Sequence, residues 1–199
     1  MHVLTVLDHP VRTSFSAAIA ERFMAGAEAA GHTTELADLH REGFDPRWTA
    51  VDAEGFTAAN TPEDIAREQS RIQRCDALCL VFPLYWWGMP AMTKGWVDRV
   101  FSAGWAYDPA MLGNPEASLL RKRSGLILMP AGANMDDEGP GSYYALLKQA
   151  WIDGTFGYCG LSPRRLEALG GAEGSATRRQ SLLERAFEAG RTLPPPTAD

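Results

Sequence analysis

The sequence lacks the features that mark several large classes of protein. It has three cysteines, which cannot all pair, so we interpret them as reduced thiols. No apolar run approaches the ~20 residues of a membrane-spanning helix, and the first residues lack the basic segment and cleavage site of a secretory signal. Positive charge is scarce, since 19 Lys and Arg face 25 Asp and Glu. We therefore expect a cytoplasmic protein whose main partner is neither nucleic acid nor an anionic membrane.

Several nucleotide-binding and catalytic motifs are also missing. The chain has no G-x-G-x-x-G, no Walker loop, no G-x-S-x-G elbow and no H-E-x-x-H. Cys75 and Cys79 straddle the start of an expected strand, so they do not form a metal-binding pair. These absences argue against a Rossmann dehydrogenase, a hydrolase and a metal site.

What the sequence does contain is a regular alternation of apolar runs and helical patterns. The expected strands cover 2–7, 33–38, 77–82, 126–129 and 164–169. The expected helices cover 14–30, 62–74, 92–101, 142–151 and 172–190. Five successive βα units predict an α/β protein with a flavodoxin-like, five-stranded parallel sheet in the order 2-1-3-4-5 and helices on both faces.

The remaining segments predict one domain with two long loops and a tail. We expect the flavodoxin-like domain to span residues 1–191, without an internal repeat. The loops cover 39–62 and 103–123, and long loops in compact domains are often functional. The Pro-rich tail, 192–199, is expected to be mobile.

Three further loops follow strands at the edge where open parallel sheets bind ligands. After the first strand, Thr13, Ser14 and Ser16 stand at a helix N-terminus, which suits either a phosphate group or simple capping. After the third strand, 83–90 holds three adjacent aromatic residues, which a flat ligand, a partner subunit or a packed turn could cover. After the fourth strand, the small residues of 130–134 admit a ligand close to the backbone or form a plain turn.

Longer segments resemble a known family. The segments 9–15, 82–90, 94–101 and 105–107 resemble the NAD(P)H quinone oxidoreductases of the flavodoxin-like fold. The resemblance extends to bacterial modulators of drug activity and to the ancillary oxidoreductases of potassium-efflux systems, and it covers roughly residues 1–170. It implies a homodimeric flavoprotein that binds FAD, with FMN as the alternative. Such a protein takes electrons from NAD(P)H and reduces quinones or similar small acceptors by ping-pong hydride transfer.

The resemblance also implies a set of site residues. The residues expected to hold the flavin phosphates and ribityl chain are His9, Thr13, Ser14, Phe15 and Ser16. Those expected to line the isoalloxazine are Pro83, Leu84, Tyr85, Trp86 and Trp87. Those expected to face its N1 and O2 atoms are Gly132, Ala133 and Asn134, and those expected near the substrate are Trp105 and Tyr107.

The sequence departs from this family at the proton relay. Mammalian members carry a tyrosine beside the flavin and a histidine six residues later. Tyr144 matches the tyrosine, but the position six residues on is Ala150, and all histidines precede residue 41. The proton must then come from a tyrosine, a water or the solvent. We predict Tyr144 as the catalytic proton donor, with Tyr143 pointing into the core. The acidic residues 136–138 form either a solvated face, which we favour, or a barrier to anionic substrates.

Two other functions remain open at this point. A flavin-holding regulatory subunit of a membrane transporter would share the same loops, and so would a one-electron carrier of the flavodoxin type. The aromatic residues around 86–87 and 105 suggest a substrate-sized pocket, which a carrier does not need.

Overall fold

The computed structural model describes residues 1–55, 60–111 and 119–197. Its centre is a five-stranded parallel sheet in the order β2-β1-β3-β4-β5, which confirms the predicted topology. The strands are β1 (His2–Leu7), β2 (Thr33–Asp38), β3 (Ala77–Val81), β4 (Ser124–Ala131) and β5 (Arg164–Gly170). β4 continues through Pro130 and Ala131, beyond the expected end, because β5 pairs with it to that point.

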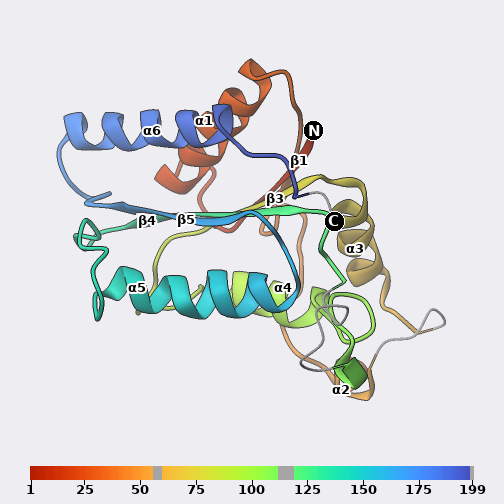
Figure 1. Ribbon diagram of the computed structural model, residues 1–199. Helices are drawn as coiled ribbons and strands as arrows, with labels where there is room; N and C mark the ends of the chain where they lie inside the picture. The colour runs from red at the N-terminus through yellow and green to blue at the C-terminus, as the bar shows by residue number, and fades with distance from the viewer. Residues whose placement is uncertain (56–59, 112–118, 198–199) are drawn as a thin grey trace.

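Helices cover both faces of the sheet (Figure 1). On one face lie α1 (Phe15–Ala29) and α6 (Ala176–Arg191). On the other face lie α3 (Glu63–Arg74), α4 (Ala91–Val100) and α5 (Tyr143–Leu147). α5 continues without a break into a π-helical segment, Lys148–Phe156, which the sequence did not predict. α6 begins at Ala176 rather than at 172 because the Ser175 side chain caps it, accepting from the Arg178 N–H.

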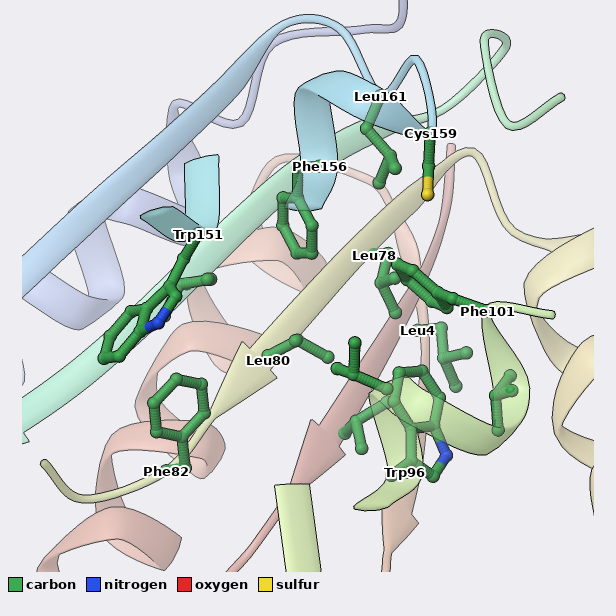
Figure 2. Packing of buried hydrophobic residues seen from close by; sticks show 14 of the residues in the cluster. Leu4, Leu78, Leu80, Phe82, Trp96, Phe101, Trp151, Phe156, Cys159 and Leu161 are labelled. Carbon is green, nitrogen blue, oxygen red and sulfur yellow. The ribbon is translucent and has the colours of Figure 1, made fainter. Parts of the chain in front are cut away.

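Each face of the sheet carries its own hydrophobic cluster. Because side chains alternate along a strand, Leu4 and Val6 of β1 enter one cluster while Val3 and Leu7 enter the other. This explains why the central strands are continuous apolar runs. Figure 2 shows the cluster that packs between the sheet and the helices α4 and Lys148–Phe156. In it the Phe82 and Trp151 rings meet edge to face, with their ring centres 5.4 Å apart.

Two glycines allow α1 and α6 to pack closely on their face of the sheet. A Cβ atom at Gly26 would collide with the Phe187 carbonyl, and one at Gly190 would collide with the Phe23 carbonyl. The backbones of the two helices therefore touch at this crossing, and any larger residue would force them apart.

The described part of the long excursion 39–62, from which residues 56–59 are excluded, is anchored to the domain. It contains a short helix, α2 (Ala50–Glu54), which no periodicity predicted. The buried Arg99 guanidinium on α4 donates to Asp52 at 3.0 Å and to Asp64 at 2.8 Å. Breaking such a buried ion pair is costly, so this cluster holds the excursion against α4.

The described part of the tail packs against the domain. Leu193 is buried, and the Thr197 N–H donates to the Ser162 carbonyl at 3.0 Å. Residues 198–199, and residues 112–118 of the expected loop 103–123, lie outside the described residues. Within the described ranges, no helix is long and apolar enough to cross a membrane.

All three cysteines are buried free thiols. Burial raises the pKa of Cys75 to about 11 and that of Cys159 to about 12, so both stay protonated and unreactive at neutral pH. The described residues contain no cluster of histidine, cysteine and carboxylate groups that could bind a metal.

Candidate functional site

The loops singled out in the sequence lie side by side at the carboxyl edge of the sheet. The Asp8 N–H, just after β1, donates to the Val81 carbonyl of β3 at 2.9 Å. The Leu84 N–H, just after β3, donates to the Pro130 carbonyl of β4 at 2.9 Å. These bonds continue the strand pairing beyond the ends of the strands. The loops after β1, β3 and β4 therefore lie next to one another at the edge where open parallel sheets bind ligands.

The loop after β1 combines a helix cap with unpaired backbone donors. The Ser14 hydroxyl accepts from the Ala17 N–H at 3.2 Å, so the capping interpretation is correct for this residue. The N–H groups of Phe15 and Ser16, in the first turn of α1, have no acceptor among the described residues. Such donors, together with the helix dipole, favour an anionic group. The loop thus caps its helix and still offers a place for phosphate.

Three side chains of this loop differ in whether they are available to contact a ligand. Thr13 is exposed. The His9 Nδ1 atom accepts from the Val11 N–H at 3.0 Å, so the neutral ring carries its proton on Nε2 and can donate from there. Phe15 lies under the Arg179 guanidinium, 4.6 Å from the ring centre, in a cation–π contact.

The aromatic loop after β3 is a tight hairpin with a strained backbone. Tyr85 and Gly88 exchange hydrogen bonds of 3.3 and 2.9 Å across it. The two central residues, Trp86 and Trp87, have φ angles of +49° and +54°. Turns with two positive φ angles strongly favour Asn-Gly, because other side chains cost about 1–3 kcal/mol each in this region.

The tryptophans of this hairpin are not packed away. Trp86 is 93% exposed and Trp87 is 47% exposed, so the packed-turn interpretation is wrong. The backbone N–H groups of Trp86 and Trp87 have no backbone acceptor among the described residues. Large exposed aromatic groups on a strained backbone are typical of a surface built to contact something else.

Tyr143 extends this aromatic surface, contrary to our expectation. We expected its ring to point into the core, but Tyr143 is 56% exposed and its ring centre lies 5.1 Å from that of Trp87. The reason is that the first turn of α5 has the exposed hairpin as its neighbour, whereas Leu147 and Trp151 further along are buried.

Tyr144, the next residue along α5, is half-buried. Its hydroxyl donates to the Leu166 carbonyl of β5 at 3.3 Å, and its ring packs against the core. Burial raises its pKa above the ordinary value, and the nearby carboxylates of Glu138 and Glu167 raise it further. The phenol is therefore held in its protonated form, as a proton donor must be before it acts.

The loop after β4 presents its backbone to solvent. Gly132, Ala133 and Asn134 are exposed, and their N–H groups have no acceptor among the described residues. A small pocket beside them is lined by Asn134, Ser142, Tyr143 and Tyr144, among others. The adjacent acidic residues 136–138 are exposed, and Asp136 pairs with Arg178 at 3.2 Å. The solvated-face interpretation of this acidic segment is thus consistent with its exposure.

An apolar cleft of about 830 Å³ adjoins the aromatic loop, a volume typical of small-ligand sites. It runs between α4 and the π-helical segment, and its wall includes Met89, Val97 and Trp151. Tyr107 lines this cleft and pairs with Tyr158 at 5.0 Å between ring centres. Trp105 instead packs, partly buried, against the core cluster. Of the two expected substrate residues, the structure thus places Tyr107 at a cavity.

A buried polar group that was not predicted lies at this edge. The Asp8 carboxylate accepts from Thr93 of α4 and from His40, which follows β2. A signal was available, because a charged residue directly after a buried strand reaches the carboxyl edge of the sheet. Its partners could not be read from the sequence.

Comparisons with known proteins agree with this fold. A model of a family described by its flavodoxin-like fold matches residues 1–192. The chain is 32% identical over 172 residues to an uncharacterized NAD(P)H oxidoreductase of Haemophilus influenzae, covering 85% of this chain and 84% of that one. It is 28% identical over 175 residues to a rat ribosyldihydronicotinamide dehydrogenase [quinone], covering 78% and 70%.

A solved structure is similar over nearly the whole chain. The NAD(P)H:quinone oxidoreductase from Methanothermobacter marburgensis superposes with a TM-score of 0.84 at 34% identity, covering 98% of this chain and 99% of that one. The chain therefore belongs to the flavodoxin-like family that includes the NAD(P)H:quinone oxidoreductases.

The backbone N–H donors and the aromatic side chains at this edge suit the chemical groups of a flavin. The α1 N-terminus offers unpaired N–H groups to phosphate, and the hairpin offers aromatic surface to a flat ring system. The exposed N–H groups of 132–134 lie at the end of the adjacent strand, β4, where they can meet the polar edge of such a ring. The phosphate and the ring of a flavin thus each have a matching surface.

Proposed function

We propose that this chain is a flavin-dependent NAD(P)H oxidoreductase that reduces quinones or similar small acceptors in ping-pong fashion. The observation that carries the proposal is the hairpin of Trp86 and Trp87, exposed and strained, beside the unpaired backbone donors of 132–134. The oxidoreductase names of the relatives support the same activity. A bound flavin would supply two-electron chemistry, accepting a hydride from NAD(P)H and releasing it to the acceptor.

The chain's own residues would bind and orient the reactants. The loop after β1 would hold the phosphates through the N–H groups of Phe15 and Ser16, with the exposed Thr13 and the His9 Nε2–H beside them. The N–H groups of 132–134 would stabilise negative charge that develops at the polar edge of the ring. Tyr144 would donate a proton once its hydroxyl leaves the Leu166 carbonyl.

We propose FAD as the flavin, with FMN as the alternative. The support is the resemblance of the first loop, with Thr13, Ser14 and Phe15, and of the long excursion 39–62 to the FAD-binding members. We also propose that the protein works in the cytoplasm, which suits three buried free cysteines.

The cleft beside the hairpin favours an enzyme over an electron carrier. A one-electron carrier passes electrons through an exposed ring edge and needs no room for an acceptor. The cleft lined by Met89, Val97 and Tyr107 provides that room for an apolar, quinone-sized molecule.

The purified protein tests the proposal directly. We expect a yellow protein with the absorption bands of an oxidised flavin, which are bleached by NADH or NADPH and restored by a quinone. Mass spectrometry of the released chromophore distinguishes FAD from FMN. A colourless protein that takes up neither flavin when it is added would refute the proposed function.

We further propose that the active form is a homodimer. The support is the exposure of four large aromatic side chains, Trp48, Tyr85, Trp86 and Tyr158, because exposed apolar groups that gather in a patch mark interaction surfaces. We expect light scattering to give about twice the chain mass of 21.7 kDa, and polar substitution of Tyr158 to shift the balance toward monomer. A flavin-loaded, fully active monomer at micromolar concentration would contradict the placement of these residues in an interface.

A further inference from the structure

Asp8 makes three hydrogen bonds to segments far from it in sequence. Its side chain is 5% exposed and stands directly after β1. One carboxylate oxygen, Oδ2, accepts from the Thr93 N–H at 2.8 Å and from the Thr93 hydroxyl at 2.5 Å. The other, Oδ1, accepts from the His40 Nε2 atom at 2.8 Å. A buried carboxylate is tolerated only when it is satisfied in this way.

These bonds give α4 the cap that its own sequence does not provide. α4 begins after Pro90, whose side chain makes no capping hydrogen bond. The Thr93 N–H belongs to the first turn, where backbone donors have no partner inside the helix. Asp8 supplies the acceptor from another strand, and its negative charge also suits the helix N-terminus. The start of α4 is thus held by a residue 85 positions away.

Two of the three segments joined by Asp8 belong to the candidate flavin site, and the third is the excursion after β2. Asp8 begins the loop that leads to the phosphate-type donors at Phe15. Thr93 lies three residues after the aromatic loop 83–90, and His40 opens the excursion 39–62. The His40 side chain is 31% exposed, and its Nδ1 atom makes no hydrogen bond within the described residues. Its Nε2 atom therefore contacts the buried carboxylate from the solvent side.

We propose that Asp8 is a positioning residue of the flavin site, which holds the aromatic hairpin at a set distance from the loop after β1. This inference rests on the proposed function. The carboxylate touches no reactant itself. It acts through Thr93, because a first turn of α4 that can shift would let the preceding hairpin shift with it. His40 supplies the hydrogen bond to Oδ1, which helps to satisfy the buried carboxylate.

The test uses paired variants with a matched control. Asp8→Ala removes all three bonds, Thr93→Val removes the hydroxyl donor, and Thr93→Ser restores it. The control is Glu68→Gln, because Glu68 is another buried carboxylate that accepts from α4, through the Trp96 Nε1–H at 3.1 Å, but comes from α3. Each variant is titrated with FMN and with FAD, and its thermal unfolding is followed. Hydrogen exchange of a peptide spanning 83–93 is measured without flavin.

We expect Asp8→Ala and Thr93→Val to weaken flavin binding at least 10-fold and to speed exchange in 83–93 by a similar factor. Thr93→Ser should stay within about 2-fold of wild type. Glu68→Gln should lower the melting temperature while leaving both readouts within about 2-fold. If Asp8→Ala fails to fold, the Thr93→Val and Thr93→Ser pair decides the matter.

Other results would overturn the inference. Unchanged flavin affinity and exchange in Asp8→Ala would exclude a positioning role. Losses in Glu68→Gln as large as those in Asp8→Ala would mean that any buried carboxylate on this face acts only through overall stability. If wild type binds no flavin, the proposed function fails. Faster exchange confined to Asp8→Ala and Thr93→Val would then still support Asp8 as the anchor of the hairpin.

Discussion

Replacing Trp86 by Asn and Trp87 by Gly is expected to stabilise the flavin-free protein while weakening flavin binding by roughly 100-fold. The double variant places the preferred Asn-Gly pair at two positive φ angles, where the tryptophans are strained. Relief of that strain should raise the free energy of unfolding by about 2 kcal/mol. For a chain of this size the melting temperature should rise by roughly 4–8 °C.

The same variant removes the aromatic surface proposed for the flavin ring. Two aromatic contacts at up to about 1.5 kcal/mol each would weaken flavin binding by roughly 100-fold. Differential scanning calorimetry of the flavin-free protein and flavin titration measure the two effects separately. Opposite signs of the two changes are the expected result, because strain at a binding site is compatible with function but not with optimal stability.

A matched control separates strain from simple loss of surface hydrophobicity. Leu146→Gln removes a large exposed apolar side chain from α5, a helix next to the hairpin, where no positive φ angle is present. Its effects on stability and flavin affinity should both be small. If the Asn-Gly variant instead loses stability, the tryptophans serve packing, and the interpretation of the hairpin as a strained ligand surface is wrong.

Tyr144→Phe is expected to lower the rate of acceptor reduction by about 100-fold, within the range for loss of a general acid. The ring that packs against the core stays, and only the hydroxyl that donates to the Leu166 carbonyl is lost. The cost in stability should therefore be about 1 kcal/mol. Rapid-mixing kinetics of the two half-reactions would locate the loss in the step that involves the acceptor.

The pH dependence follows from the direction of the pKa shift. Burial raises the pKa of Tyr144 above its ordinary value of 10.0, so the phenol keeps its proton through the neutral range. Activity that depends on this proton should be flat from pH 7 to 9 and fall only above pH 10. Tyr144→Phe should lose that high-pH limb.

Tyr143→Phe is the companion variant. Its hydroxyl is lost from an exposed ring that still contacts Trp87, so we expect a change of less than about 3-fold. A larger loss from Tyr143→Phe than from Tyr144→Phe would assign the proton donor to the exposed tyrosine. Equal rates in wild type and Tyr144→Phe would mean that water supplies the proton.

Much of the fold was predictable because its signals are local. Apolar runs such as 77–82 are too hydrophobic for a sheet with one wet face, and the helical patterns between them leave right-handed crossovers as the connection. Together they predicted the observed strand order. The π-helical segment 148–156 was not predictable, because its extra residue per turn depends on packing against the sheet rather than on composition.

The candidate site was predictable in position but not in orientation. The sequence placed the chemistry in three loops, and the structure brings those loops together. It could not show that Tyr143 faces the hairpin while Tyr144 turns toward β5, because the two lie in the same first turn of one helix. Which of the two side chains packs against the core depends on how the first turn of that helix is oriented relative to the sheet.

The sequence by itself determined the five strands, the helices that connect and follow them, their order and the edge that carries the loops, since each depends on residues close together in the chain. It did not determine α2 or the π-helical segment. Only the tertiary structure decided that Asp8 caps α4 through Thr93 and pairs with His40. It also decided that Arg99 holds the excursion through Asp52. These bonds join residues 32 to 85 positions apart, and a buried charge has no detectable partner until the chain has folded around it.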